Sequence, residues 1–132
     1  MKIRVTINFE DNGYSAYSRD VPDVLLTAQG ETLDEVKKDM LEVIEEVKSM
    51  DDAPLILKQG YEVDWAFSIP AFLSKFEGML SQSGLALLSG INPSLLSAYK
   101  SEQKKPSKAQ VDKLQQAVNK FANDLLSTPL TV

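Results

Sequence analysis

Carboxylates are the first candidates for chemistry in this chain, because its 132 residues include no histidine and no cysteine. Histidine is the side chain that most often transfers protons near neutral pH, and with cysteine it supplies most transition-metal sites. Clustered carboxylates can hold Mg²⁺ for phosphodiester hydrolysis, and four acids stand near predicted strand ends: Glu10, Asp11, Asp20 and Asp23. No glycine-rich phosphate loop, serine elbow or zinc-ligand spacing accompanies them. Acidic turn residues are usually solvated, so we expect no enzyme activity, no metal site and no cofactor.

A different chemistry, the recognition of DNA, is indicated by two short predicted helices, residues 84–89 and 94–100, separated by Gly90. Glycine enters the left-handed turn conformation without a Cβ clash. Asn92 is a strong helix N-cap, and Pro93 suits the first helical position. This spacing is typical of a helix-turn-helix, whose second helix enters the major groove of DNA. The alternative is an ordinary corner between two helices that only pack against the rest of their domain.

The second of these helices and the lysines after it supply the candidate DNA contacts. Short side chains at the exposed start of the helix can approach base edges, but none is an arginine that could bind guanine, and the lysines can reach phosphates. Because one such helix reads few bases, we expect a homodimer or a higher homo-oligomer, joined through the last helix and the C-terminal tail. The candidate DNA-binding residues are Asn92, Pro93, Ser94, Ser97, Ala98, Lys100, Lys104, Lys105 and Lys108.

The first 70 residues predict three strands, a helix and a fourth strand. A capping box from Thr32 to Glu35 opens the helix, which carries one apolar stripe. A short apolar run, residues 55–57, is of unclear state. One helix over a mostly antiparallel sheet gives the α+β fold class. Alternation of apolar and polar residues places the strands at residues 2–10, 14–19, 24–29 and 61–67, with an Asp-Asn-Gly hairpin turn after the first.

The remaining residues predict helices only. A helix over residues 71–82 precedes the central pair, and a second capping box, Ser107 to Gln110, opens the last helix. Apolar residues recur every three or four positions in that helix, so we expect one of its faces to be buried. These residues are Val111, Leu114, Val118, Phe121 and Leu125. We therefore expect two domains, residues 1–69 and an all-α domain of residues 70–132.

Charge divides the chain at nearly the same place. Residues 1–70 carry seven Lys or Arg and fifteen Asp or Glu, a net charge of −8, whereas residues 71–132 carry seven Lys and four acids, a net charge of +3. An acidic half joined to a basic half suggests two partners of opposite charge. No apolar run reaches the roughly 20 residues of a membrane span, and the N-terminus has no signal-peptide core. We expect a cytoplasmic protein that does not contact a membrane.

Together the two halves resemble a HicB-type antitoxin of the bacterial HicA–HicB toxin–antitoxin systems. In the N-terminal half, residues 8–47 carry the marks: a Gly-Tyr second strand, a Val-Pro-Asp step, and Gln-Gly before a Thr-x-x-Glu helix start. The C-terminal half resembles the helix-turn-helix variant of these antitoxins and, more broadly, Cro/repressor-like domains. Two features depart from the pattern: Glu102 stands where glycine is usual, and the recognition face lacks arginine. The matching C-terminal residues are Ala86, Gly90, Ile91, Leu96, Tyr99 and Pro106.

The resemblance implies a βββαβ module with a partial RNase H-like fold that lacks nuclease activity and covers a small basic HicA-type toxin, an mRNA-cleaving ribonuclease. It implies that the helix-turn-helix domain dimerises and represses the operon by binding double-stranded operator DNA. Acids on the first helix, such as Glu42, Glu45 and Glu46, offer a second surface for the toxin. The alternatives are a stand-alone transcription regulator with an N-terminal ligand-sensing or dimerisation module and, more weakly, a metal-dependent nuclease. The candidate toxin-binding residues around the hairpin are Glu10, Asp11, Tyr14, Asp20 and Asp23.

Overall fold

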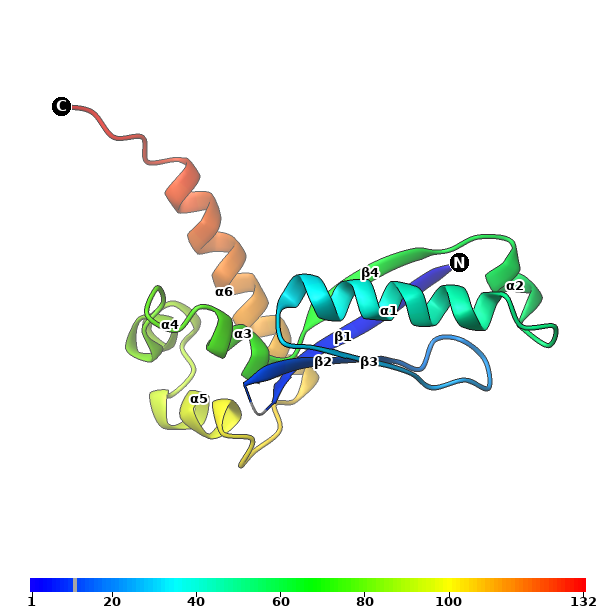
Figure 1. Ribbon diagram of the computed structural model, residues 1–132. Helices are drawn as coiled ribbons and strands as arrows, with labels where there is room; N and C mark the ends of the chain where they lie inside the picture. Colours follow the sequence, from blue (N-terminus) through cyan, green and yellow to red (C-terminus); the bar gives the residue numbers. More distant parts are fainter. Residues whose placement is uncertain (11) are drawn as a thin grey trace. The chain divides into compact units, whose positions relative to one another are not determined.

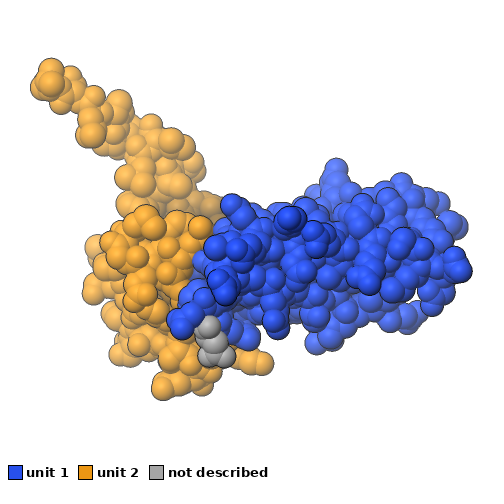
Figure 2. Space-filling model, in the orientation of Figure 1, with its two compact units in different colours: residues 1–71 blue, residues 72–132 orange. Residues whose placement is uncertain are grey.

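The computed structural model describes residues 1–10 and 12–132, which form two compact units, residues 1–71 and 72–132 (Figure 2). The division falls inside helix α3, Ile69–Lys75, two residues beyond the boundary expected from the sequence. The acidic half of the chain is therefore unit 1 and the basic half is unit 2.

Unit 1 is a four-stranded mixed sheet with helix α1, Leu33–Lys48, packed on one face (Figure 1). The strand order is β3-β2-β1-β4; β1 pairs antiparallel with β2 and parallel with β4. The helix lies between β3 and β4 in sequence, so it is the crossover to the parallel strand. The predicted α+β class is confirmed. The strands are β1 Lys2–Glu10, β2 Gly13–Ser18, β3 Leu26–Gly30 and β4 Glu62–Phe67.

The core of unit 1 lies between the sheet and α1. Side chains of a strand alternate between its two faces, so Ile3, Val5 and Ile7 of β1 all face α1 and are fully buried. The residues between them face the other side and are exposed or half-buried. A Cβ on Gly30 would lie only 2.4 Å from the backbone nitrogen of Val36, so the close approach of β3 to α1 requires glycine. The helix contributes Val36, Met40, Ile44 and Val47 to the core.

Local signals set most element ends in unit 1. The Thr32 hydroxyl accepts a hydrogen bond from the Glu35 backbone N–H at 3.1 Å, as the capping box predicts. Strand β3 begins two residues later than expected because residues 21–24 form a turn, in which Val24 N–H donates to the Val21 carbonyl and Asp23 is left-handed at φ 63°. The apolar run of unclear state forms the short helix α2, Leu55–Lys58, which buries Leu57.

Unit 2 contains the end of α3 and three further helices: α4 Gln82–Ser89, α5 Pro93–Lys100 and α6 Lys108–Leu126. The prediction of one helix over residues 71–82 is wrong. The helix ends at Lys75, a turn with Gly78 at φ 86° follows, and Ser81 caps α4 by accepting from Gly84 N–H at 2.9 Å. A glycine followed by a capping serine ends one helix and begins the next.

The helices of unit 2 bury a small apolar core. It contains Leu85 of α4, Ile91 of the turn, Leu96 and Tyr99 of α5, and Leu114 of α6. The expected buried face of α6 is present only in part: Leu114 is buried and Val118 and Phe121 are half-buried, whereas the residues at the two ends of the predicted face, Val111 and Leu125, are exposed. In the part of the chain that the structure describes, no helix has the length and apolar character required to cross a membrane.

Candidate functional site

The turn between α4 and α5 is built from backbone and side-chain contacts that fix its shape. Gly90 ends α4 in the left-handed conformation, with φ 72°, and its N–H donates to the Ala86 carbonyl at 2.8 Å. A residue with a Cβ would be strained at that φ. The buried Ser89 hydroxyl donates to the Leu85 carbonyl at 2.6 Å and accepts from Ile91 N–H at 3.2 Å. The turn therefore sets the direction in which α5 leaves α4.

Helix α5 presents its first residues to solvent. The Asn92 side chain accepts a hydrogen bond from Ser94 N–H at 2.8 Å, and Pro93 occupies the first turn, as predicted. Leu96 and Tyr99 hold the opposite side of the helix in the core. The exposed face carries short side chains, and short side chains allow the helix backbone to come close to a base edge. Its exposed residues are Asn92, Pro93, Ser94 and Ser97, and Ala98 is half-buried beside them.

The predicted phosphate-binding lysines fall into two groups. Lys100 donates to the Glu77 carboxylate at 2.7 Å and its side chain is 28% exposed, so its charge is already partly neutralised. Lys108 pairs with Asp112, one turn later in α6, at 3.3 Å. Lys104 and Lys105 are exposed in the α5–α6 loop, and among the described residues they form no ion pair. Of the four predicted lysines, these two are the most available to phosphates.

Glu102 stands at a strained position in the same loop. Its φ of 62° is left-handed, the region that glycine enters without penalty. This is the position where the helix-turn-helix pattern usually has glycine. The carboxylate also places a negative charge two residues before Lys104. Glu102 therefore strains the backbone of the loop, and its charge offsets part of the positive charge of Lys104 and Lys105.

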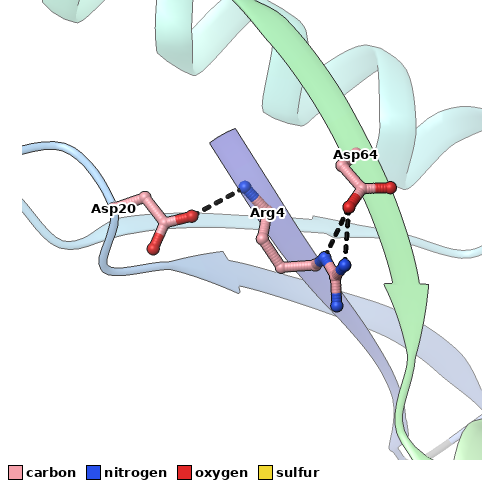
Figure 3. A network of polar contacts seen from close by, with 3 residues as sticks. All are labelled: Arg4, Asp20 and Asp64. Carbon is pink, nitrogen blue, oxygen red and sulfur yellow. Dashed lines mark hydrogen bonds and ion pairs between the residues drawn. The ribbon is translucent and has the colours of Figure 1, made fainter. Parts of the chain in front are cut away.

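Asp20, a candidate partner-binding residue, is engaged within unit 1. Its carboxylate accepts a hydrogen bond from the backbone N–H of Arg4 at 2.8 Å, beyond the end of β2 (Figure 3). The guanidinium group of Arg4 pairs with Asp64 of β4 at 2.7 Å. Asp20 thus accepts the hydrogen bond of a β1 backbone N–H at a level that β2, which ends at Ser18, no longer reaches. The sequence did not indicate this structural role.

The other candidate partner-binding residues do not join Asp20. Asp23 is exposed in the turn between β2 and β3. Glu10 and Tyr14 lie at the opposite end of β2, where Glu10 is the last residue of β1 and Tyr14 is near the start of β2. Glu10 and Tyr14 line an open depression of about 700 Å³ together with Glu31 and Glu35, neither of which the sequence indicated as a partner-binding residue. The Glu35 carboxylate accepts from Glu31 N–H at 3.0 Å. Asp11 lies outside the described residues.

The described carboxylates form no group of three that could hold a metal ion. The depression has acidic walls and one aromatic side chain, which suits a cationic group on a partner. Comparison of the chain with protein-family models, with curated proteins and with solved structures gave no match.

Proposed function

We propose that this protein is a transcriptional repressor and antitoxin of the HicB type. In this proposal unit 2 binds double-stranded operator DNA through α5. Unit 1, as a partial RNase H-like module, binds and blocks a basic HicA-type ribonuclease. The observation that carries the proposal is the α4–Gly90–α5 geometry, in which a capped second helix exposes its first turn while its other side is buried.

Charge supports the division of labour. Unit 2 carries +3 and displays the exposed Lys104 and Lys105 in the loop after α5, where phosphates flanking a groove can be reached. Unit 1 carries −8, and a ribonuclease needs a basic face to attract RNA. An acidic surface can dock on that face and compete with RNA for it.

DNA binding is tested with duplex DNA from the region upstream of this gene. Ser97→Glu places a negative charge on the exposed face of α5, and Gln116→Glu places the same charge on an exposed site of α6. We expect Ser97→Glu to abolish detectable binding by fluorescence anisotropy and Gln116→Glu to leave it within threefold of wild type. Equal binding by the two variants would remove α5 from the interface.

Partner binding is tested with the protein encoded by the adjacent gene. We expect the full-length chain to co-purify with that protein and to abolish its ribonuclease activity. The Ser97→Glu variant should do the same, because the substitution lies in unit 2. If the adjacent product neither co-purifies nor cleaves RNA, the antitoxin role fails, and DNA binding alone leaves a stand-alone regulator.

A further inference from the structure

Unit 2 carries seven lysines, which differ in what surrounds their ammonium groups. Lys100 and Lys108 pair with carboxylates, and Lys75 stands over the ring of Phe76 at 5.7 Å. The other four are exposed, and in the part of the chain that the structure describes their ammonium groups pair with no carboxylate. These four are Lys104, Lys105, Lys113 and Lys120.

Lys113 lies against the turn between α4 and α5, although it belongs to α6. Gly90 has no side chain, and a Cβ built on it would stand 3.7 Å from both Cε and Nζ of Lys113. The ammonium group therefore occupies the space beside the left-handed glycine that ends α4. Gly90 and Lys113 are both exposed, so this ammonium is at the surface of the turn. Asn92, the N-cap of α5, follows two residues after Gly90, and the two Cα atoms lie at most about 7.6 Å apart.

The end of α4 holds the ammonium group of Lys113 without neutralising it. The C-terminal end of a helix carries a partial negative charge, which attracts a cation. Helix α4 ends at Ser89, next to Gly90 and therefore beside this ammonium. Asp112, the acid adjacent to Lys113 in the sequence, already pairs with Lys108 at 3.3 Å. The charge of Lys113 is therefore held at the turn and remains available to a phosphate.

Helix α5 has exposed lysines beyond both of its ends. Its eight residues span about 12 Å, which is also about the width of the major groove of DNA. Lys113 stands beside the turn before its first residue, and Lys104 and Lys105 follow its last residue. Phosphates line both sides of the groove, and contacts to them fix the register and orientation of a protein on the duplex. Lysines beyond both ends of α5 can therefore reach phosphates on both sides of the groove.

We infer that Lys113 binds a phosphate of the DNA backbone at the turn between α4 and α5. It fixes the start of α5 on the duplex, and it adds affinity without adding sequence specificity. This role rests on the proposed binding of DNA by unit 2. It lies on α6, outside both α5 and the loop after it. Removal of the charge should therefore weaken binding to an operator duplex and to a scrambled duplex by the same factor.

An anisotropy salt series tests this role with full-length chains and duplex DNA from the region upstream of the gene. We expect Lys113→Gln to weaken binding roughly eightfold at about 0.1 M salt and to reduce the slope of log affinity against log salt by about 0.9 for each bound chain. Lys113→Arg keeps the charge and should keep the slope. Lys120→Gln, the matched control, removes the same charge from an exposed site about two turns later on α6 and should also keep the slope. A change of slope reports on phosphate contacts, so weaker capping of α4 alone would not produce it.

Lysine acetylation mapped by mass spectrometry gives a second measurement that needs no substitution. An N-hydroxysuccinimide acetate ester should modify Lys113 in the free wild-type chain, because its ammonium group is exposed. The upstream duplex at low salt should protect Lys113 together with Lys104 and Lys105. Lys120 should react equally with and without the duplex.

The outcomes separate failure of this role from failure of DNA binding. If wild type binds the duplex but Lys113→Gln keeps its slope, or Lys113 stays unprotected, Lys113 does not contact a phosphate and DNA binding by unit 2 stands. Equal losses in Lys113→Gln and Lys120→Gln would show a general effect of net charge, and an equal loss in Lys113→Arg would show that the positive charge is not what matters; either overturns the role. A wild-type chain that binds no duplex contradicts both proposals.

Discussion

Glu102 gives a prediction whose size can be worked out, because it has a left-handed backbone conformation that favours glycine over a residue with a Cβ. Replacing it with glycine removes the Cβ that makes φ 62° unfavourable. A left-handed non-glycine residue costs about 1–2 kcal/mol. Glycine also lowers the free energy of unfolding by about 0.4–1 kcal/mol, because the unfolded chain gains conformational freedom, and this offsets part of the gain. We expect Glu102→Gly to stabilise unit 2 by roughly 0.5–1 kcal/mol.

The assay is thermal unfolding followed by circular dichroism at the helix band. For a domain of 60–100 residues, 1 kcal/mol corresponds to about 4–8 °C in Tm, so the expected rise is roughly 2–8 °C. Trp65, the chain's one tryptophan, lies in β4, so its fluorescence reports on the unfolding of unit 1. It therefore distinguishes a change in the stability of unit 1 from a change in the stability of unit 2. Urea unfolding should show a higher midpoint with an unchanged slope.

Glu102→Gln is the matched control, since it removes the charge and keeps the Cβ. We expect it to leave Tm within about 2 °C of wild type, because an exposed charge alone contributes little. Both variants should bind DNA more tightly than wild type at low salt, since both remove a negative charge near Lys104 and Lys105. If Glu102→Gly is no more stable than Glu102→Gln, the strain argument is refuted.

Two further predictions concern charges in the two units. Lys104→Ala with Lys105→Ala should weaken binding to all duplexes alike and reduce the slope of log affinity against log salt by about two, which an anisotropy salt series measures; an unchanged slope would exclude both lysines from phosphate contacts. Asp20→Asn keeps an oxygen acceptor for the Arg4 amide and should unfold like wild type in urea, whereas Asp20→Ala should lose about 1 kcal/mol. Equal stability of the two Asp20 variants would show that the hydrogen bond from the Arg4 amide does not contribute to the free energy of unfolding. Slower association of Asp20→Asn with the basic partner, with its stability unchanged, would assign the charge of Asp20 to docking.

Features encoded within a few residues could be predicted from the sequence. The alternation in β1, the Thr32 capping box and the Asn92 cap depend on neighbours in the chain, and the structure has all three. The prediction of one helix over residues 71–82 is wrong because the apolar spacing continues across a break. Gly78 lies in a turn after α3, and Ser81 caps the start of α4.

Features that depend on distant residues could not be predicted in this way. Periodicity in α6 identifies its apolar side, but it does not show whether another element of the chain packs against Leu125, which is exposed in the structure. The sequence marks Asp20 as an acid near a strand end, and only the fold brings it to the Arg4 amide. The pairing of Lys100 with Glu77, 23 residues away, likewise depends on how α5 packs in unit 2.

The central claim is that α5 reads DNA sequence, and a specificity ratio tests it most directly. The affinity of the full-length chain is measured by anisotropy at one salt concentration, about 0.15 M, for duplex DNA from the region upstream of its gene and for a scrambled duplex of identical composition. The account predicts that the upstream duplex binds at least about 10³-fold more tightly, which is the lower end for specific recognition. Equal affinities would contradict it, because binding would then come from the lysines and the phosphates alone.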